Sequence, residues 1–115
     1  MGAALGTTYP AARAVFAEID EALGQSLSKL MWEGPENELV LTENAQPALM
    51  AVSLAAMRVL AEEKGIKLSN KVAFVAGHSL GEYSALAAAE SLSVADTARL
   101  LKIRGKAMQE AVPVG

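Results

Sequence analysis

The chain has 115 residues, a length that fits one modest domain or a piece of a larger one. Hydrophobic residues make up 52% of the sequence and aromatic residues only 4%, a balance that excludes a disordered chain and favours helices packed through small side chains. With a net charge of −3, no cysteine and a single histidine, the composition argues against nucleic-acid binding, disulfides and a metal site built from cysteine or histidine.

The first predicted element is an amphipathic helix from Pro10 to Leu23, with Pro10 suited to its first turn and Gly24 to its C-cap. Its apolar residues recur at helical spacing: Val15, Phe16, Ile19 and Leu23. In the next stretch, residues 27–41, the pair Gly34-Pro35 breaks regular structure. We expect a short helical turn and a loop there.

A second helix is predicted with Thr42 or Asn44 as its N-cap and Gly65 at its end. Pro47 would then occupy the first turn, where a missing backbone N–H costs little. Its expected core-facing residues are Leu49, Met50, Ser53, Met57 and Leu60.

Residues 71–77 are predicted to form a β-strand, because Val72-Ala73-Phe74-Val75-Ala76 is continuously apolar. An apolar run without alternation indicates burial on both faces, as in a parallel sheet. Such a strand needs neighbouring strands for its backbone groups, and the sequence offers only this convincing one. We therefore expect the other strands to lie before residue 1 or after residue 115, and unpaired strand edges would favour self-association.

After the strand, helical patterning resumes from Gly81 to about Glu90. Ser91-Leu92-Ser93 forms a turn, and Ser93-Val94-Ala95-Asp96 begins the last helix with a capping-box-like signature. No internal repeat or linker marks a domain boundary within the chain.

The motif with the clearest chemical meaning is Gly77-His78-Ser79-Leu80-Gly81, placed between the predicted strand and helix as in a nucleophile elbow. A tight turn requires glycines on both sides of the serine and lifts the Ser79 hydroxyl clear of the sheet. The amide of Leu80, at the start of the helix, would be free to donate to an oxyanion. The competing interpretation is a glycine-bracketed serine that serves only as a turn.

The run Gly77-His78-Ser79-Leu80-Gly81-Glu82, followed by Tyr83-Ser84-Ala85-Leu86, resembles the active-site segment of malonyl-CoA:acyl-carrier-protein transacylases and of acyltransferase domains in polyketide and fatty-acid synthases. Residues 42–49 and 104–109 resemble two further segments of this family, so the resemblance covers essentially the whole chain. It implies an α/β fold: a fragment of an α/β-hydrolase-like acyltransferase domain, mostly helical, with one buried parallel strand leading to the elbow.

Two family features are missing from this sequence. Family members have a Gly-Gln-Gly-Ser-Gln segment near the N-terminus, which helps form the oxyanion hole, and a histidine base well beyond the elbow. We therefore expect residues 1–115 to be part of the large subdomain, without the ferredoxin-like small subdomain. We also expect negligible transferase turnover from the chain by itself, because the base and one oxyanion donor are lacking.

The resemblance assigns Arg104 to the substrate carboxylate, and helix lengths support this role. The elbow helix descends about ten residues, ~15 Å at 1.5 Å per residue, and the next helix climbs back as far by Arg104. A guanidinium can then grip a malonyl carboxylate through two parallel hydrogen bonds. Spacing alone would favour a solvated arginine. Met108, one turn on, is as consistent with core packing as with substrate contact.

Four further residues are expected to support the site: Gly77, His78, Gly81 and Gln46. His78 is the only histidine, but its side chain diverges from that of its neighbour Ser79, so a structural role is favoured over a base. Gln46 resembles a family position near the site, where a buried hydrogen-bonding role is favoured. Glu82 suits the positive end of the elbow helix, and stabilisation is as consistent with this position as catalysis.

In the enzymes that the chain resembles, the serine takes a malonyl group from malonyl-CoA and passes it to the phosphopantetheine thiol of acyl carrier protein, in fatty-acid biosynthesis. The implied partners are thus a coenzyme A thioester and acyl carrier protein, with no metal or redox cofactor. We expect a cytoplasmic protein without membrane contact, because the apolar stretches are short and no basic-then-apolar leader opens the chain. A serine esterase or thioesterase, and a non-catalytic helical binding module, are the alternatives.

Overall fold

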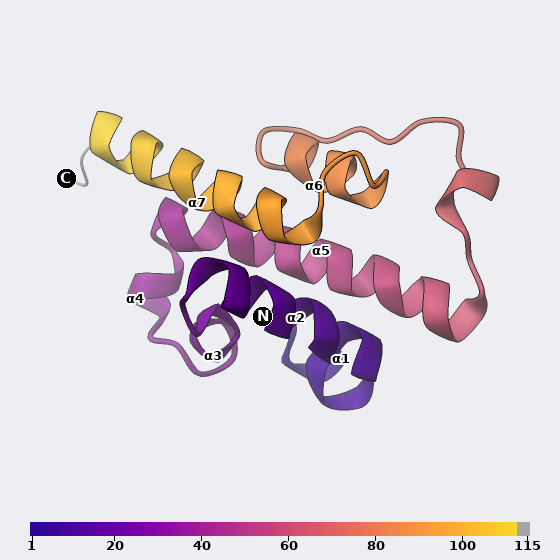
Figure 1. Ribbon diagram of the computed structural model, residues 1–115. Coiled ribbons are helices and arrows are strands. Elements are labelled where there is room, and N and C mark those ends of the chain that lie inside the picture. Colours follow the sequence, from indigo (N-terminus) through magenta and orange to yellow (C-terminus); the bar gives the residue numbers. More distant parts are fainter. Residues whose placement is uncertain (113–115) are drawn as a thin grey trace.

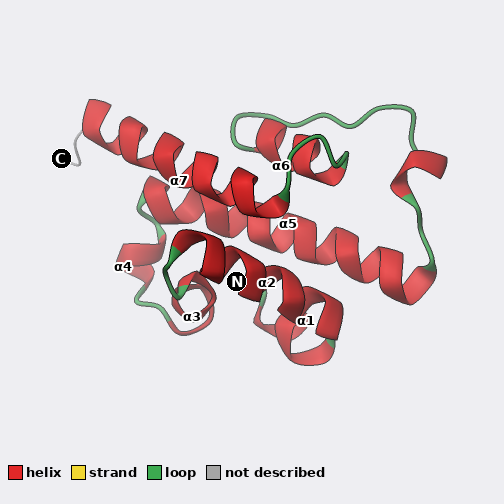
Figure 2. Cartoon of the chain, in the orientation of Figure 1, coloured by secondary structure: helices red, strands yellow, loops and turns green. Residues whose placement is uncertain are grey.

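The computed structural model describes residues 1–112 and consists of helices joined by loops (Figures 1 and 2). In chain order the elements are α1 (Ala3–Thr8), α2 (Pro10–Leu23), α3 (Leu27–Glu33), α4 (Glu36–Leu39), α5 (Thr42–Lys64), the 3₁₀ turn η1 (Leu68–Asn70), α6 (Gly81–Ala88) and α7 (Val94–Ala111). The prediction of a mostly helical chain is confirmed. Within residues 1–112, no helix is both long enough and apolar enough to cross a membrane.

The core lies where α2, α5 and α7 meet. The helices α5 and α7 run side by side through the middle of the molecule, and α2 packs against both (Figure 1). Each contributes fully buried side chains, among them Ile19, Met50 and Leu101. Small residues allow the close approach: Ala12, Ala48, Ala51, Ala55 and Ala98 are all buried. The expected packing through small side chains is therefore confirmed.

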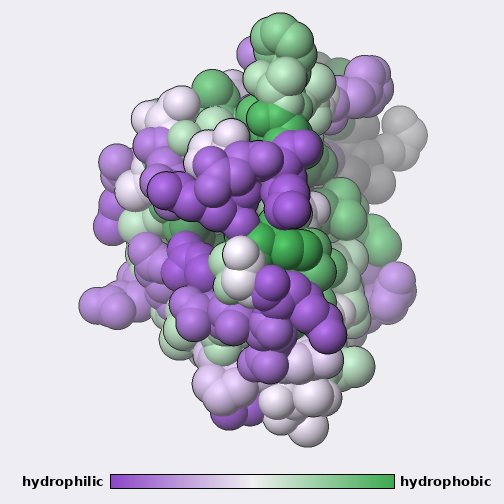
Figure 3. All heavy atoms as spheres, turned by 90° about the vertical axis from the view of Figure 1, so that its right-hand side faces the viewer, coloured by the Kyte–Doolittle hydropathy of each residue, from purple (hydrophilic) through white to green (hydrophobic). Residues whose placement is uncertain are grey.

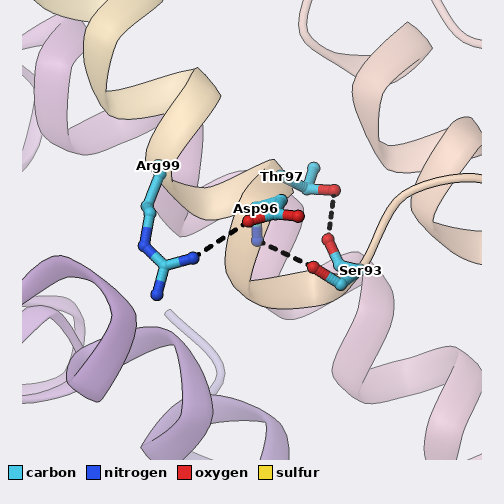
Figure 4. Close-up of polar contacts among 4 residues, drawn as sticks. All are labelled: Ser93, Asp96, Thr97 and Arg99. Carbon is cyan, nitrogen blue, oxygen red and sulfur yellow. Dashed lines mark hydrogen bonds and ion pairs between the residues drawn. The ribbon is translucent and has the colours of Figure 1, made fainter.

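Local signals act as predicted at several helix ends, including Gly65, which is the left-handed C-cap of α5. α2 begins at Pro10 and ends at Leu23, and its C-cap Gly24 adopts the left-handed conformation that glycine tolerates best. α7 begins after Ser93, whose Oγ accepts a hydrogen bond from the Asp96 amide at 3.0 Å, while the Ser93 carbonyl accepts from the Thr97 hydroxyl at 2.7 Å (Figure 4). The N-cap bond satisfies an amide that has no partner within the helix.

The start of α5 differs from the prediction. The helix begins at Thr42 with Leu41 as its N-cap, so Pro47 lies inside the helix and not in its first turn. Asn44 does not cap the helix; its amide nitrogen instead donates to the Glu38 carbonyl at 2.9 Å, and its Oδ1 accepts from Lys102 at 2.8 Å. The polar side chain is thus used for tertiary contacts.

The predicted core-facing residues of α5 are also mostly wrong. Of the five, only Met50 is buried; Leu49, Ser53 and Leu60 are exposed, and Met57 is half-buried. The buried face consists of Asn44, Gln46, Pro47, Ala48, Met50, Ala51, Leu54, Ala55 and Val59. Because α5 is covered by α2 on one side and by α7 on another, its buried face is wider than the single stripe assumed from the sequence.

The predicted buried strand over residues 71–77 is not formed in the part of the chain that the structure describes. These residues adopt an irregular path after η1, and all are exposed, with Phe74 at 91%. A parallel strand needs neighbours to accept and donate its backbone hydrogen bonds, and residues 1–112 supply none. The side of the molecule on which α5 ends has a mostly hydrophilic surface interrupted by hydrophobic patches (Figure 3).

Candidate active site

The turn from His78 to Glu82 connects the irregular segment to α6. The amide of Gly81 donates to the His78 carbonyl at 2.8 Å, and the amide of Glu82 donates to the Ser79 carbonyl at 3.2 Å. Ser79 has a φ of 55°, in the left-handed region that non-glycine residues rarely occupy. Strained backbone of this kind is found preferentially at functional sites. The motif therefore forms the sharp turn predicted for a nucleophile elbow.

The two glycines of the motif have different roles. A Cβ on Gly77 would fall on the backbone carbonyl of Gly81, so no side chain fits at residue 77. A Cβ on Gly81 would meet nothing within 4 Å, and Gly81 is not among the residues with positive φ. The expectation that the turn needs glycine on both sides of Ser79 is correct for Gly77 and wrong for Gly81.

Ser79 is exposed at the tip of the turn. The amide of the next residue, Leu80, has no hydrogen-bond acceptor among residues 1–112. The carbonyl of Leu80, by contrast, accepts a hydrogen bond from the Tyr83 amide at 3.0 Å. A free amide directly after an exposed serine hydroxyl can donate to an oxyanion that forms at that hydroxyl. The turn thus places a free backbone amide directly after an exposed hydroxyl.

Arg104 lies beside this hydroxyl. Its Nη2 donates to Ser79 Oγ at 3.3 Å, and its Nη1 donates to Gln46 Oε1 at 2.6 Å. The guanidinium also lies over the ring of Tyr83, with 5.7 Å between Cζ and the ring centroid, a cation–π geometry. α7 therefore returns Arg104 to the level of Ser79, as the helix lengths predicted.

Gln46 connects Arg104 to Thr42 and Met108. It is 3% exposed and sits in the first turns of α5. Its Nε2 donates to Thr42 Oγ1 at 2.7 Å and to the sulfur of Met108 at 3.3 Å. The buried hydrogen-bonding geometry expected for Gln46 is present. Met108 is 44% exposed, so it contacts the site without being part of the core.

The remaining candidates lie apart from this cluster. His78 and Glu82 are both exposed, and neither side chain is hydrogen-bonded to Ser79. Within residues 1–112, the Ser79 hydroxyl contacts no carboxylate or imidazole, so its side-chain partner is Arg104. The described residues also contain no group of three or more His, Cys, Asp or Glu side chains that could hold a metal ion.

Sequence reasoning did not identify two residues that the structure places at the site. The sequence indicates Tyr83 only as part of the motif, yet its ring forms the aromatic surface under Arg104. A sequence signal existed, since Tyr83 lies only four residues after Ser79, in the first turn of α6. Thr42 was considered only as a cap, and its role as an acceptor for Gln46 follows from the i, i+4 spacing of the two residues on α5.

Comparisons with known proteins agree with this geometry. The model of the family described as "Acyl transferase domain" matches residues 1–115. A curated relative, the malonyl CoA-acyl carrier protein transacylase of Bacillus subtilis (strain 168), is 49% identical over 115 residues, which cover 100% of this chain and 35% of that protein. The chain thus spans about a third of the length of the curated relatives it matches.

Solved structures give the same result. The acyl-carrier-protein-S-malonyltransferase of Bartonella henselae superposes with a TM-score of 0.94 at 60% identity, covering 100% of this chain and 36% of that one. A malonyl-transacylase in complex with a type II PKS acyl-carrier protein superposes with a TM-score of 0.89 at 48% identity, with the same two coverages, 100% and 36%. The helices and the elbow described above therefore have close counterparts in solved acyltransferases.

Proposed function

Since the chain belongs to the acyl transferase domain family, we propose that it carries the nucleophile and the carboxylate-binding side of a malonyl-CoA:acyl-carrier-protein transacylase active site. The observation that carries the proposal is the 3.3 Å contact between Arg104 Nη2 and Ser79 Oγ. This contact places the exposed Ser79 hydroxyl, on a strained turn, beside the Arg104 guanidinium, a cation that can bind the carboxylate of a carboxylated acyl group. Curated relatives with the name of such a transacylase support the same function.

The proposed reaction has two acyl-transfer steps. Ser79 Oγ attacks the thioester carbonyl of malonyl-CoA, the C–S bond breaks, and the coenzyme A thiol leaves with the proton that Ser79 has lost. The phosphopantetheine thiol of acyl carrier protein then attacks the seryl ester and restores the hydroxyl. The Leu80 amide stabilises the oxyanion in both steps. No metal or redox cofactor takes part in this scheme.

The carboxylate of a malonyl group on Ser79 is separated from Oγ only by the carbonyl carbon and one methylene. Arg104 therefore lies within reach of that carboxylate without a large rearrangement, because it already contacts Oγ. Met108 would line the acyl pocket through its contact with Gln46. Gly77 allows the turn, and the His78 carbonyl supports it by accepting the Gly81 amide.

The proposal requires residues beyond this chain for full activity. A serine nucleophile needs a base, and among residues 1–112 no imidazole or carboxylate contacts Ser79. We propose that residues 1–115 form part of the large subdomain, with the base and the ferredoxin-like small subdomain supplied elsewhere. By itself, the 115-residue chain would have negligible turnover.

The exposed segment before the elbow fits the same proposal. In a complete α/β-hydrolase-like domain, residues 71–77 would pair with neighbouring strands and become the buried strand expected from their apolar run. The Ser84 hydroxyl is buried without a partner among the described residues and lines a groove with Val75, Ala76 and Gly77, so a neighbouring chain segment there would supply a missing hydrogen bond. A cytoplasmic location, where malonyl-CoA and acyl carrier protein meet, completes the proposal.

The proposed protein partner is acyl carrier protein, and the proposed acyl donor is a coenzyme A thioester. One similar structure is a malonyl-transacylase bound to an acyl-carrier protein, which supports this type of partner. The exposed Phe74 would additionally promote self-association of the isolated chain.

The test uses two proteins: the 115-residue chain, and a chimera in which residues 1–115 replace the matched segment of the Bacillus subtilis relative. The chimera should transfer a labelled malonyl group from malonyl-CoA to acyl carrier protein, form a malonyl adduct at Ser79 detectable by intact mass, and lose transfer upon Ser79→Ala. Undiminished transfer by Ser79→Ala would refute the proposal. Prompt release of the acyl group to water would favour the esterase or thioesterase alternative instead.

A further inference from the structure

We infer that Gln46 is a positioning residue for Arg104 and, together with Thr42, sets the selectivity of the site for carboxylated acyl groups. The inference rests on the proposed function, and it concerns how the cation is held and not which residue carries the charge. Its starting point is the short Nη1 to Oε1 contact of 2.6 Å between a half-buried arginine and a glutamine that is 3% exposed.

The orientation of the Gln46 amide is determined by its partners. A guanidinium can only donate hydrogen bonds, so the atom that faces Arg104 must be the acceptor Oε1. The Nε2 group then points the other way, where Thr42 Oγ1 at 2.7 Å and the Met108 sulfur at 3.3 Å can accept. Three contacts therefore lock the amide, and the locked amide fixes Nη1 of the arginine.

Fixing Nη1 determines which part of the guanidinium is left for substrate. Nη2 is directed at Ser79 Oγ, and the ring of Tyr83 covers one face of the group. When Oγ becomes an ester oxygen it is a poorer acceptor, and a nearby carboxylate would replace it as the partner of Nη2. Gln46 would keep its hydrogen bond to Nη1 throughout. It thereby holds Arg104 in place while Nη2 exchanges Ser79 Oγ for the substrate carboxylate.

The chemistry of the partners preserves the charge. Gln46, Ser79 and Tyr83 are all neutral, and no carboxylate of residues 1–112 lies within salt-bridge distance of Arg104. By contrast, Lys102 and Arg99 each have an acidic neighbour. A neutral acceptor positions the arginine without cancelling its charge, which leaves that charge available for an incoming carboxylate.

The decisive substitution is Gln46→Glu, measured in the chimera with malonyl-CoA and acetyl-CoA as alternative donors. The introduced carboxylate has the same shape and can still accept from Nη1, but it neutralises Arg104 and repels a malonyl carboxylate. The ratio of malonyl to acetyl kcat/KM should fall by ~10-fold or more, within the range expected for one charge-assisted hydrogen bond. Gln46→Met, which keeps the volume and removes the acceptor, should lower the ratio by ~3- to 10-fold.

Because both donors are measured in the same protein, a general loss of folding cancels from the ratio. The matched control is Gln25→Glu, a half-buried glutamine whose amide donates to Asn44 and lies outside the site; its ratio should match that of the unsubstituted chimera. An unchanged ratio in Gln46→Glu, while Arg104→Ala abolishes malonyl selectivity, would overturn the inference and leave the proposed function intact. Absence of malonyl selectivity in the unsubstituted chimera would overturn both.

If the chimera fails to fold, the same test can be made on the 115-residue chain with sodium malonate as the probe. Binding is followed through the Arg104 Nε–Hε signal in NMR spectra, with chloride at matched ionic strength as reference. Gln46→Glu should raise the malonate dissociation constant by ~10-fold or more. Equal binding by the substituted and unsubstituted chains would overturn the inference.

Discussion

Arg104 and Ser79 are 25 residues apart in the sequence, yet Nη2 of the first lies 3.3 Å from Oγ of the second. The contact depends on the turn at residues 91–93. α6 leads away from the elbow, and after this turn α7 leads back along α6 toward it. Neither residue has an acidic or imidazole partner among residues 1–112. The pair thus offers a hydroxyl and an unneutralised cation to one ligand.

Replacing Arg104 with alanine should affect carboxylated substrates selectively. In the chimera, Arg104→Ala should lower malonyl kcat/KM by ~10- to 100-fold, because a hydrogen-bonded charge is lost, and change acetyl transfer by less than ~3-fold. Steady-state transfer from each coenzyme A thioester measures this. The matched control is Arg99→Ala on the same helix, an exposed arginine paired with Asp96 that should leave both rates unchanged (Figure 4). Equal losses for malonyl and acetyl would contradict a carboxylate-binding role.

The strain at Ser79 should be visible in the stability of the chain. A left-handed conformation costs a non-glycine residue about 1 kcal/mol, so Ser79→Gly should raise the free energy of unfolding by roughly that amount. Ser79→Ala keeps the Cβ and should give no such gain, although both variants lose the nucleophile. Urea denaturation of the three proteins measures the difference. Equal stability of Ser79→Gly and Ser79→Ala would show that the turn is not strained.

Features with a local physical cause could be predicted from the sequence. Pro10, Gly24 and Ser93 each act through their own backbone or a neighbouring amide, so their positions at helix ends could be read directly. The approach of Arg104 to Ser79 could be estimated because it depends only on two helix lengths and one turn. The elbow is likewise a local motif, although its sequence alone did not show that only Gly77 is sterically required.

Features that depend on distant contacts could not be predicted in the same way. Residues 71–77 have strand-like sequence, but a strand forms only when other strands pair with it. The buried face of α5 is set by the helices that cover it. The local sequence around Asn44 is compatible with an N-cap, and it does not reveal that Asn44 instead forms a tertiary hydrogen bond with Lys102. The contacts of Gln46 with Arg104 and Met108 join residues 58 and 62 positions apart, beyond any sequence spacing rule.

α5 and α7 are packed tightly at Gly105, next to Arg104. A Cβ at this position would lie 2.5 Å from Glu43 Cα and 2.7 Å from the Thr42 carbonyl oxygen, both of which are backbone atoms that cannot easily move. Gly105→Ala should therefore destabilise the chain by about 1–3 kcal/mol through overpacking, although alanine usually favours a helix. Gly81→Ala, at a position with open space, should be neutral or stabilising. Chemical denaturation checks both; an increase in stability for Gly105→Ala would refute the close packing.

The N-cap of α7 should contribute a measurable share of stability. Ser93→Ala removes the acceptor for the Asp96 amide and should lower the free energy of unfolding by about 1 kcal/mol. Ser91→Ala is the matched control, because this exposed serine lies in the same turn and its amide, not its hydroxyl, makes the hydrogen bond to Leu86. Its effect should stay within about 0.5 kcal/mol. Similar losses for the two variants would indicate that the cap bond is not formed in solution.

The exposed segment before the elbow should control the association of the isolated chain. Phe74 is 91% exposed, and Val72 and Val75 beside it are about half as exposed, so the segment offers apolar surface together with unpaired backbone groups. Burying a phenylalanine between two chains would stabilise a dimer by about 1.5–3 kcal/mol, and unpaired backbone groups favour strand pairing.

Phe74→Asp removes the apolar ring and adds a charge that repels its copy. Sedimentation of the 115-residue chain should show concentration-dependent association that Phe74→Asp shifts toward the monomer. Val40→Asp, at an exposed apolar residue that ends α4 and lies outside residues 71–77, should leave association unchanged. Equal association of all three proteins would mean that residues 71–77 do not mediate contact between copies, and the strand proposed for the complete domain would then lack support from its behaviour in isolation.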